Sequence, residues 1–519
     1  MTTATGGEDS ERWRRWIVPL ALLAVVFAID FAAMPGIWCI GDPFAWREEA
    51  RSLVRDHVLH VNAQFAQSFG EPGQYFVVNP KNGLWYSKYG IVNSLMALPP
   101  TVLEYMVHGR VPSVGEPSDL LIFNLYNILL SLAACGLLLR ITGWYTNRSW
   151  VRVVYVLTVC YATFYWFYQR AQDSKIYEIL FYTGAFYFLM DYLRGLRDMQ
   201  GRPDRKCQMA LLGAWMFVAA LLLTRVVYGL LIPAIWLLVL YAARPSDGGP
   251  GWRFRVPEIA CLLLPPLLAV GALAWIDQVK FGAPWLTGYH QWRASAHWPT
   301  GRWQDGIWGI LFDPQASMLL HFPILMFALL ALREFYRRYK LDTVVLFVLP
   351  LGLFLFLTKM AGWRGEWAYG PRYMIFMLPL LALPFVVFLE RLAESPCRPA
   401  NVAMATVTLV ALTYSTYLQY EANRLDFWAL YHISYGVDDS WNREMARYFL
   451  DHQMGVFNAD LIRHKDDLDD LPFVAELEKR GLAGPQLQAY KKRLREYAVD
   501  ENFYWKRVRS DSDRAAGEQ

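Results

Sequence analysis

Long runs of apolar residues recur along the chain and are separated by short polar stretches. A helix needs about 20 predominantly apolar residues to cross the hydrocarbon core of a bilayer. The runs that reach or approach this length are residues 16–38, 119–139, 150–168, 175–193, 207–224, 227–243, 256–276, 317–332, 342–358, 373–390 and 401–419. The pattern predicts an all-α polytopic membrane protein with about eleven transmembrane helices.

The apolar stretch 89–107 is harder to assign, because it contains the adjacent prolines Pro99 and Pro100. A proline inside a helix removes a backbone hydrogen bond. We therefore expect a break there and interpret the stretch as a re-entrant or interfacial helix, with a further crossing as the open alternative.

Basic residues fall in short clusters between the apolar runs, and such clusters mark the cytoplasmic side of a membrane protein. With eleven spans and a cytoplasmic N-terminal tail (residues 1–15), every cluster lies on that side. The transmembrane domain covers residues 16–419. The extracytoplasmic parts are then the first loop (40–118, with amphipathic helices), the loops 169–174 and 277–316, the stretch 359–372 and a polar C-terminal extension (420–519) with a helical pattern.

The same count requires an even number of crossings between Lys206 and Arg244. Two short helices with a tight apex near Thr224-Arg225 satisfy this requirement. Arg225 is then expected at the outer side or part-way down the membrane, facing a cavity, because a charge inside a bilayer is costly and avoids lipid.

Composition limits the classes of function. The 519 residues are 55% hydrophobic and 18% charged, with a net charge of +4, which is too small to indicate nucleic-acid binding. The six cysteines have no paired spacing, so neither a disulfide framework nor a zinc cluster is expected. No P-loop, dinucleotide fingerprint or nucleophile elbow lies in a supporting context.

The first loop begins with the acidic stretch GDPFAWREEARSL. A carboxylate at Asp42, close to the outer end of the first span, can take a proton from a bound hydroxyl. Alternatively Asp42 is a helix N-cap, since Asp followed by Pro is a common helix start. Glu48 and Glu49 are rival bases, or members of a solvated helical charge run.

The motif YSKYG, later in the first loop, places Lys88 between two tyrosines. Its ammonium group can hold a lipid-linked phosphate, or it can extend to lipid head groups. Tyr86 is a candidate contact to the sugar or the acceptor.

Two further outer loops carry candidate residues. AQDSKIYE offers Asp173, as a second acid or an N-cap, and Glu178. The loop 277–316 is rich in tryptophan and contains Tyr289 and His290. Aromatic rings with scattered polar groups suit sugars, although tryptophan is also enriched at membrane interfaces. The histidines lack a tight ligand spacing, so no metal is expected to be required.

The stretch GWRGEWAYGPRY precedes the run 373–390. Its Gly-Pro corner directs Arg372 into the outer end of the next span, where a guanidinium can bind phosphate oxygens in a bidentate geometry. An interfacial anchor is the alternative. Trp363, Glu366 and Tyr369 are candidate contacts to the sugar or the acceptor.

The order of these motifs resembles that of a bacterial member of the GT-C superfamily of polytopic glycosyltransferases, similar to the protein O-mannosyltransferase and aminoarabinose transferase branch. The resemblance covers about residues 15–420. It rests on GDPFAWREEARSL, YSKYG before ALPP, AQDSKIYE, LTRVVYGLLIP, FGAPWLTGY with GILFDP, and GEWAYGPRYMIFMLPLL.

The resemblance implies a multi-pass protein of the bacterial inner (plasma) membrane that uses a polyprenyl-phosphate-linked sugar and transfers it to an envelope acceptor with inversion. It implies Asp42 as general base, Asp173 or Glu178 as the second acid, and Lys88, Arg225 and Arg372 as the phosphate cradle. Many relatives have adjacent acids in the first loop, whereas Pro43 follows Asp42 here, so Glu48 and Glu49 stay open as the base.

Other function classes remain compatible with a polytopic chain that carries intramembrane charges. A lipid or glycan transporter more often shows repeated halves, and none is visible here. A non-catalytic scaffold and a glycan polymerase or ligase are the further alternatives.

Overall fold

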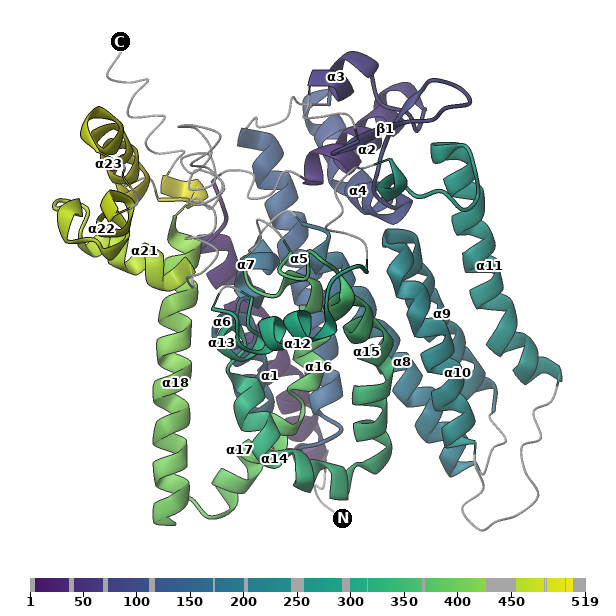
Figure 1. Cartoon of the computed structure of the whole chain (residues 1–519). Coiled ribbons are helices and arrows are strands. Elements are labelled where there is room, and N and C mark those ends of the chain that lie inside the picture. The colour runs from purple at the N-terminus through teal and green to yellow at the C-terminus, as the bar shows by residue number, and fades with distance from the viewer. Residues whose placement is uncertain are drawn as a thin grey trace.

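The computed structural model describes residues 5–36, 42–68, 73–111, 117–170, 173–199, 204–243, 256–291, 299–314, 316–365, 369–425, 454–479, 481, 483–499 and 501–506. These residues are predominantly helical, as predicted, with one small antiparallel hairpin, β1 (Phe76–Val78) and β2 (Trp85–Ser87), in the first loop. Figure 1 shows an elongated bundle of helices with further helices at one end.

Helices occupy all eleven predicted apolar runs. They are α1 (Thr5–Ala32), α5 (Pro117–Thr142), α6 (Ser149–Tyr161), α7 (Tyr165–Arg170), α8 (Lys175–Asp198), α9 (Arg205–Thr224), η1 (Val226–Leu230), α10 (Leu231–Ala242), α11 (Val256–Phe281), α13 (Met318–His321), α14 (Ile324–Arg338), α15 (Lys340–Lys359), η4 (Arg372–Met374), α16 (Leu378–Leu381), α17 (Pro384–Glu394) and α18 (Pro399–Arg424). The runs 150–168, 227–243, 317–332 and 373–390 are each divided into shorter pieces. Helix α1 begins within the predicted N-terminal tail.

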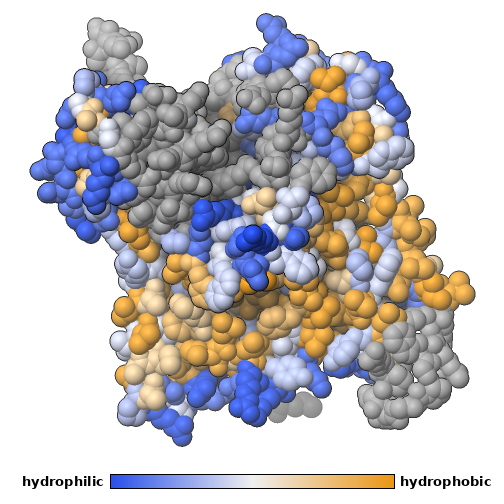
Figure 2. Space-filling view, viewed as in Figure 1, coloured by the Kyte–Doolittle hydropathy of each residue, from blue (hydrophilic) through white to orange (hydrophobic). Residues whose placement is uncertain are grey.

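Five of the described helices, α5, α9, α11, α15 and α18, are long and apolar enough to cross a membrane. Figure 2 shows a broad hydrophobic band around this face of the bundle, with hydrophilic residues gathered beyond it at both ends. Leucines on α11, such as Leu267 and Leu268, are more than 60% exposed. Such a surface needs lipid to cover it. The chain is a multi-pass membrane protein, and the count of eleven crossings stays a prediction.

The first loop forms a compact unit at the end of the bundle away from the start of α1 (Figure 1). It contains α2 (Asp42–Asp56), α3 (Ala63–Ser68), the hairpin and α4 (Ile91–His108). Helix α4 continues through Pro99 and Pro100, so the predicted break is wrong. It packs along α2, where Arg47 reaches Glu104 at 2.9 Å. This packing and buried ion pair outweigh the loss of two backbone hydrogen bonds.

The C-terminal extension forms α21 (Met454–Arg463), η5 (Leu468–Asp470), α22 (Pro472–Lys479) and α23 (Gly484–Val499). These elements share a small apolar core that includes Leu461, Phe473 and Leu494. They lie beside the upper end of α18 (Figure 1). The helical pattern read from the sequence is confirmed for α22 and α23.

A short segment after α23, residues 501–506, returns to the bundle and contacts the end at which α1 finishes. The Tyr504 amide donates to the Met34 carbonyl at 2.8 Å, just beyond α1. The Trp505 indole nitrogen donates to the Phe31 carbonyl at 2.9 Å. The segment thus joins the C-terminal helices to α1.

Candidate active site

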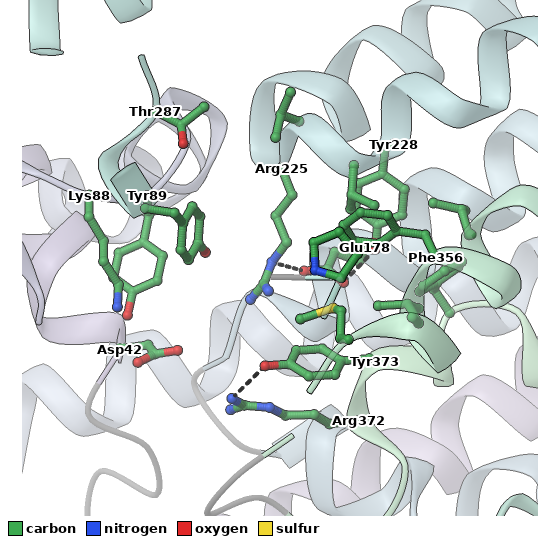
Figure 3. Close-up of a pocket in the computed structure, with 18 of the residues that line it drawn as sticks. Asp42, Lys88, Tyr89, Glu178, Arg225, Tyr228, Thr287, Phe356, Arg372 and Tyr373 are labelled. Atoms are coloured by element: carbon green, nitrogen blue, oxygen red, sulfur yellow. Dashed lines mark hydrogen bonds and ion pairs between the residues drawn. The ribbon is translucent and has the colours of Figure 1, made fainter. Parts of the chain in front are cut away.

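A cavity of about 470 Å³ lies between the first loop and the ends of several bundle helices. Figure 3 shows polar side chains converging on it from different elements. Its lining combines acidic, basic, aromatic and apolar residues. The lining residues are Asp42, Lys88, Tyr89, Lys175, Glu178, Arg225, Val226, Val227, Tyr228, Trp285, Thr287, Tyr289, His290, Pro299, Leu353, Phe356, Leu357, Met360, Arg372, Tyr373 and Phe376. Seven predicted residues, from distant parts of the sequence, therefore meet in one place: Asp42, Lys88, Glu178, Arg225, Tyr289, His290 and Arg372.

Asp42 is the first residue of α2, as a helix start at Asp-Pro predicts. Its side chain is directed toward Lys88 and Tyr89 (Figure 3). Burial acts to raise the pKa of Asp42, but the positive charges of Arg372 and Lys88, helped by the Tyr89 hydroxyl, lower it overall. The carboxyl group is therefore ionised at neutral pH and available as a proton acceptor.

Lys88 is buried among tyrosine rings at the turn between β2 and α4. Its Nζ lies 5.1 Å from the centre of the Tyr89 ring, 5.5 Å from that of Tyr289 and 5.9 Å from that of Tyr75. Such rings stabilise a cation through their negative faces. Lys88 is thus held at the cavity and does not extend to head groups.

Arg225 lies at the apex that the sequence predicted. Helix α9 ends at Thr224, Arg225 itself is extended, and η1 starts at Val226. Gly90 lies directly against this apex, because a Cβ atom there would be 2.2 Å from the Leu223 carbonyl oxygen. The missing side chain at Gly90 lets the Lys88 turn approach Arg225.

Arg372 begins η4, directly after the Gly-Pro corner. Gly370 has a φ of +63°, which favours glycine, and a Cβ atom there would be 2.8 Å from the Phe164 ring. A terminal nitrogen of Arg372 donates to the Tyr373 hydroxyl at 3.2 Å (Figure 3). Among the described residues, the buried Arg372 Nε has no hydrogen-bond partner.

Glu178 lines the cavity, but it is already occupied by three neighbours. Its carboxylate lies 2.7 Å from Lys175 Nζ and 3.0 Å from Arg225 Nε, and it accepts from the Tyr228 hydroxyl at 2.6 Å. The structure therefore places it as the counter-charge of two cations, and not primarily as a sugar contact. Lys175, from the same stretch AQDSKIYE, is a lining residue that the sequence did not predict.

Asp173 is buried beside the cavity and is absent from its lining. The Ser174 hydroxyl donates to its carboxylate at 3.2 Å. Burial raises the pKa of Asp173, and the nearby Asp42 adds to this, while Lys175 opposes it. Asp173 and Asp42 thus feel each other's charge, with their pKa values moved in opposite directions.

Glu49 and Glu48, the rival bases, are buried on α2 away from the cavity lining. Glu49 forms an ion pair with Lys280 at 2.9 Å, and Glu48 one with Arg51 at 3.5 Å. Neither belongs to a solvated charge run, and neither faces the cavity. Glu48 and Glu49 follow Asp42 by about two turns of α2, which is a distance of about 10 Å along the helix axis. They therefore cannot take the place of Asp42 at the cavity.

Three aromatic candidates lie outside the cavity lining. Tyr86 is buried in β2, and its hydroxyl accepts from Asn82 at 3.3 Å. The Tyr369 hydroxyl donates to Gln419 at 2.8 Å. Trp363 packs against Gly309. Their proposed contacts with sugar or acceptor lose support, and Glu366 lies outside the described residues.

Further lining residues were not predicted from the sequence, among them Tyr89, Tyr228, Trp285, Thr287 and Tyr373. The tyrosines in YSKYG and GPRY adjoin predicted cations, and this adjacency was the available signal. In the described part of the chain, no group of three or more histidine, cysteine, aspartate or glutamate residues is placed to hold a metal ion.

No family model and no curated protein matches the chain. It is similar to the crystal structure of ArnT from Cupriavidus metallidurans bound to undecaprenyl phosphate, with 13% identity, a TM-score of 0.48, and coverage of 96% of this chain and 76% of that chain.

The chain is also similar to the archaeal oligosaccharyltransferase AglB from Archaeoglobus fulgidus, in complex with an inhibitory peptide and a dolichol-phosphate. The identity is 11% and the TM-score 0.47, over 91% of this chain and 61% of that chain, so this chain spans less than two thirds of AglB. Function does not follow from similarity this low.

Proposed function

We propose that this protein is an inverting membrane glycosyltransferase, which moves a sugar from a polyprenyl-phosphate donor to an envelope acceptor at the extracytoplasmic face. One observation carries the proposal: the Asp42 carboxylate faces a cavity that also holds Lys88, Arg225 and Arg372. A reaction that releases a phosphate from an anomeric carbon needs these two kinds of group. Cations stabilise the negative charge that develops on the phosphate, and a base accepts the acceptor's proton.

The apolar part of the cavity suits a lipid-linked donor. Val226, Leu353, Phe356 and Leu357 contribute apolar surface beside the charged groups. They belong to η1 and α15, and α15 is long and apolar enough to cross a membrane. The donor's phosphate would lie among the three basic side chains, while its chain would extend along these helices.

Asp42 is the best candidate for the general base. In a single displacement the acceptor hydroxyl attacks the anomeric carbon, the bond to phosphate breaks, and the hydroxyl proton passes to the base. The leaving phosphate carries away the bonding electrons, and because the hydroxyl attacks from the opposite face, the configuration at the anomeric carbon is inverted. Three basic side chains can neutralise a monophosphate, and the proposed reaction needs no metal ion.

The first experiment compares envelope glycans and glycolipids by mass spectrometry. A strain lacking the protein receives the wild-type chain, Asp42→Asn or Asp305→Asn, the last being a matched control because Asp305 is exposed on α12 (Trp303–Phe312). We expect one sugar increment with the wild type and the control, and none with Asp42→Asn at equal protein level.

Two results contradict the proposal in different ways. If Asp42→Asn restores the increment, the base is another residue. If the wild type adds no sugar but changes which membrane leaflet holds a glycolipid, the protein is a transporter.

A further inference from the structure

A buried ion pair between Glu49 and Lys280 lies just behind the cavity. Both side chains are about 1% exposed or less. Lys280 Nζ lies 2.9 Å from Glu49 Oε1 and 3.0 Å from Oε2. The partners are 231 positions apart in sequence, on α2 and at the end of α11. The pair therefore joins two elements that are far apart in the sequence.

Further hydrogen bonds tie the pair to the Lys88 turn. Lys280 Nζ also donates to the Tyr89 carbonyl oxygen at 2.8 Å. Glu49 accepts from the Ser87 amide at 3.3 Å and from the Ser94 hydroxyl at 2.5 Å. A buried ion pair is stabilising only when its remaining donors and acceptors find such partners. Here these partners flank Lys88 on both sides.

The pair also controls the direction of Asp42. Glu49 follows Asp42 by seven residues, about two turns of α2, so the two side chains leave the same side of the helix. Because Glu49 is held at both carboxylate oxygens, α2 cannot rotate about its axis without breaking these bonds. The orientation of Asp42 relative to the cavity is thereby set.

Lys280 adds a third connection. It precedes the loop that carries Thr287 and Tyr289 into the cavity, and α11 ends at Phe281. One ion pair is therefore connected to three segments that contribute cavity-lining residues: helix α2, the turn 87–90 and, through the end of α11, the loop that follows it.

We propose that Glu49 and Lys280 are positioning residues, which hold Asp42, Lys88 and Tyr289 in register for donor binding and proton transfer. This inference rests on the proposed function. The pair acts through its neighbours, since neither residue lines the cavity. A displacement of about 1 Å at reacting groups can reduce a rate by about 100-fold.

The test uses the full chain in lipid nanodiscs and the variants Glu49→Gln, Lys280→Met and the double variant. Asp342→Asn is the matched control, because Asp342 is also a buried carboxylate that pairs with an arginine, Arg194, and accepts from a hydroxyl, that of Tyr145 at 2.8 Å. Sugar transfer is measured per folded molecule, over a range of pH. Binding of polyprenyl monophosphate is measured separately.

We expect kcat to fall by about 10- to 100-fold in the single variants. We also expect the acidic limb of the pH profile, which is the fall in kcat at low pH as the base becomes protonated, to move to higher pH. The limb moves because the charged and titratable groups that face Asp42 change their positions relative to its carboxylate. These groups are Arg372, Lys88, Tyr89, Arg225, Asp173 and Tyr289. Asp342→Asn should change the yield of folded protein but leave the limb in place.

The double variant separates positioning from folding, because it leaves no unpaired buried charge. If it folds like the wild type and still has the moved acidic limb, the positioning role is supported. Should a single variant fail to fold, Ser94→Ala removes only one hydrogen bond to Glu49 and is expected to show a smaller shift in the same direction.

Wild-type kcat and an unmoved limb in the folded variants would overturn the inference. If the wild type itself transfers no sugar, the proposed function fails instead. The positioning role is then decided by lipid-phosphate binding, which should weaken in the pair variants and not in Asp342→Asn.

Discussion

Arg225 and Glu178 meet at the wall of the cavity, where Arg225 Nε lies 3.0 Å from Glu178 Oε1. Arg225 comes from the apex between α9 and η1, and Glu178 from the first turn of α8. Because Glu178 also binds Lys175, one carboxylate compensates two cations. A phosphate entering the cavity would therefore compete with Glu178 for the same positive charges.

This competition predicts the behaviour of Glu178→Gln. Two buried cations lose their counter-charge, and removing one partner of a buried ion pair costs about 3–5 kcal/mol of stability. An anionic ligand should restore part of that loss, since binding to the folded state stabilises it. We expect a lower Tm than that of the wild type and a larger rise in Tm with polyprenyl monophosphate.

Thermal unfolding in nanodiscs, with and without the lipid phosphate, measures this effect. Asp342→Asn serves again as the control, because it removes the partner of a partly buried arginine, Arg194, and neither residue lines the cavity. Equal ligand-induced rises in Tm for Glu178→Gln and Asp342→Asn would show that Glu178 does not share its cations with a phosphate.

The pH dependence of turnover distinguishes Asp42 from Asp173 as the base. The pKa of Asp42 lies below its ordinary value of 3.8, so Asp42 stays ionised as the pH falls toward that value. The pKa of Asp173 is raised by burial, and Asp173 would take up its proton at a higher pH. With Asp42 as base, kcat should stay level from about pH 7 to pH 5.

The same shift has a consequence for stability. A carboxyl group with a lowered pKa contributes stability above its ordinary pKa and loses it as the pH falls through the folded value. Asp42→Asn should therefore unfold more easily than the wild type at neutral pH, with the difference vanishing in acid.

In the pH profile of turnover, a decline of kcat between pH 7 and pH 5 would favour Asp173 as the base.

Arg372 should not be replaceable by lysine. A guanidinium offers a planar pair of donors to phosphate oxygens, whereas an ammonium group offers a single point of charge. We expect Arg372→Lys to reduce kcat/KM for the donor by about 10- to 100-fold, which corresponds to about 1.4–2.7 kcal/mol. Steady-state kinetics with a defined donor measures it.

Arg364→Lys is the control for Arg372→Lys. Arg364 lies in the same stretch, pairs with Asp313 at 2.5 Å and does not line the cavity. If both replacements reduce kcat/KM equally, Arg372 acts as an interfacial anchor and not as a phosphate ligand.

The C-terminal segment should stabilise the bundle through Arg170. The buried guanidinium donates to the Asn423 carbonyl at 2.6 Å and to the Asn502 carbonyl at 2.9 Å. Ending the chain after Asp500 removes the second bond, and the loss of a partner by a buried charged donor costs about 1–3 kcal/mol. We expect a lower Tm, with the helical content measured by circular dichroism largely kept.

A chain ended after Trp505 retains Asn502 and both contacts to α1, and is the control for that truncation. If the two truncations have the same Tm, residues 501–505 do not stabilise the bundle.

Much of the fold follows from the sequence because the length of an apolar run and the position of a basic cluster are local properties of the chain. The eleven runs became helical segments, and the apex at Arg225 formed where the charge pattern required it. Pro99 and Pro100 show the limit of local reasoning. Their effect on α4 was outweighed by contacts with α2, which are made by residues about 50 positions away.

The sequence by itself indicated which chemical groups gather at one end of the bundle. Asp42, Lys88, Arg225 and Arg372 each lie in a motif beside an end of a predicted helix. It could not decide among Asp42, Glu48 and Glu49, because all three acids belong to one helix and differ only in their surroundings. The tertiary structure separates their surroundings, because it brings Lys280 to Glu49 and leaves Asp42 facing the cavity. The charge and exposure of a carboxylate depend on neighbours from distant segments, and only folding brings those neighbours together.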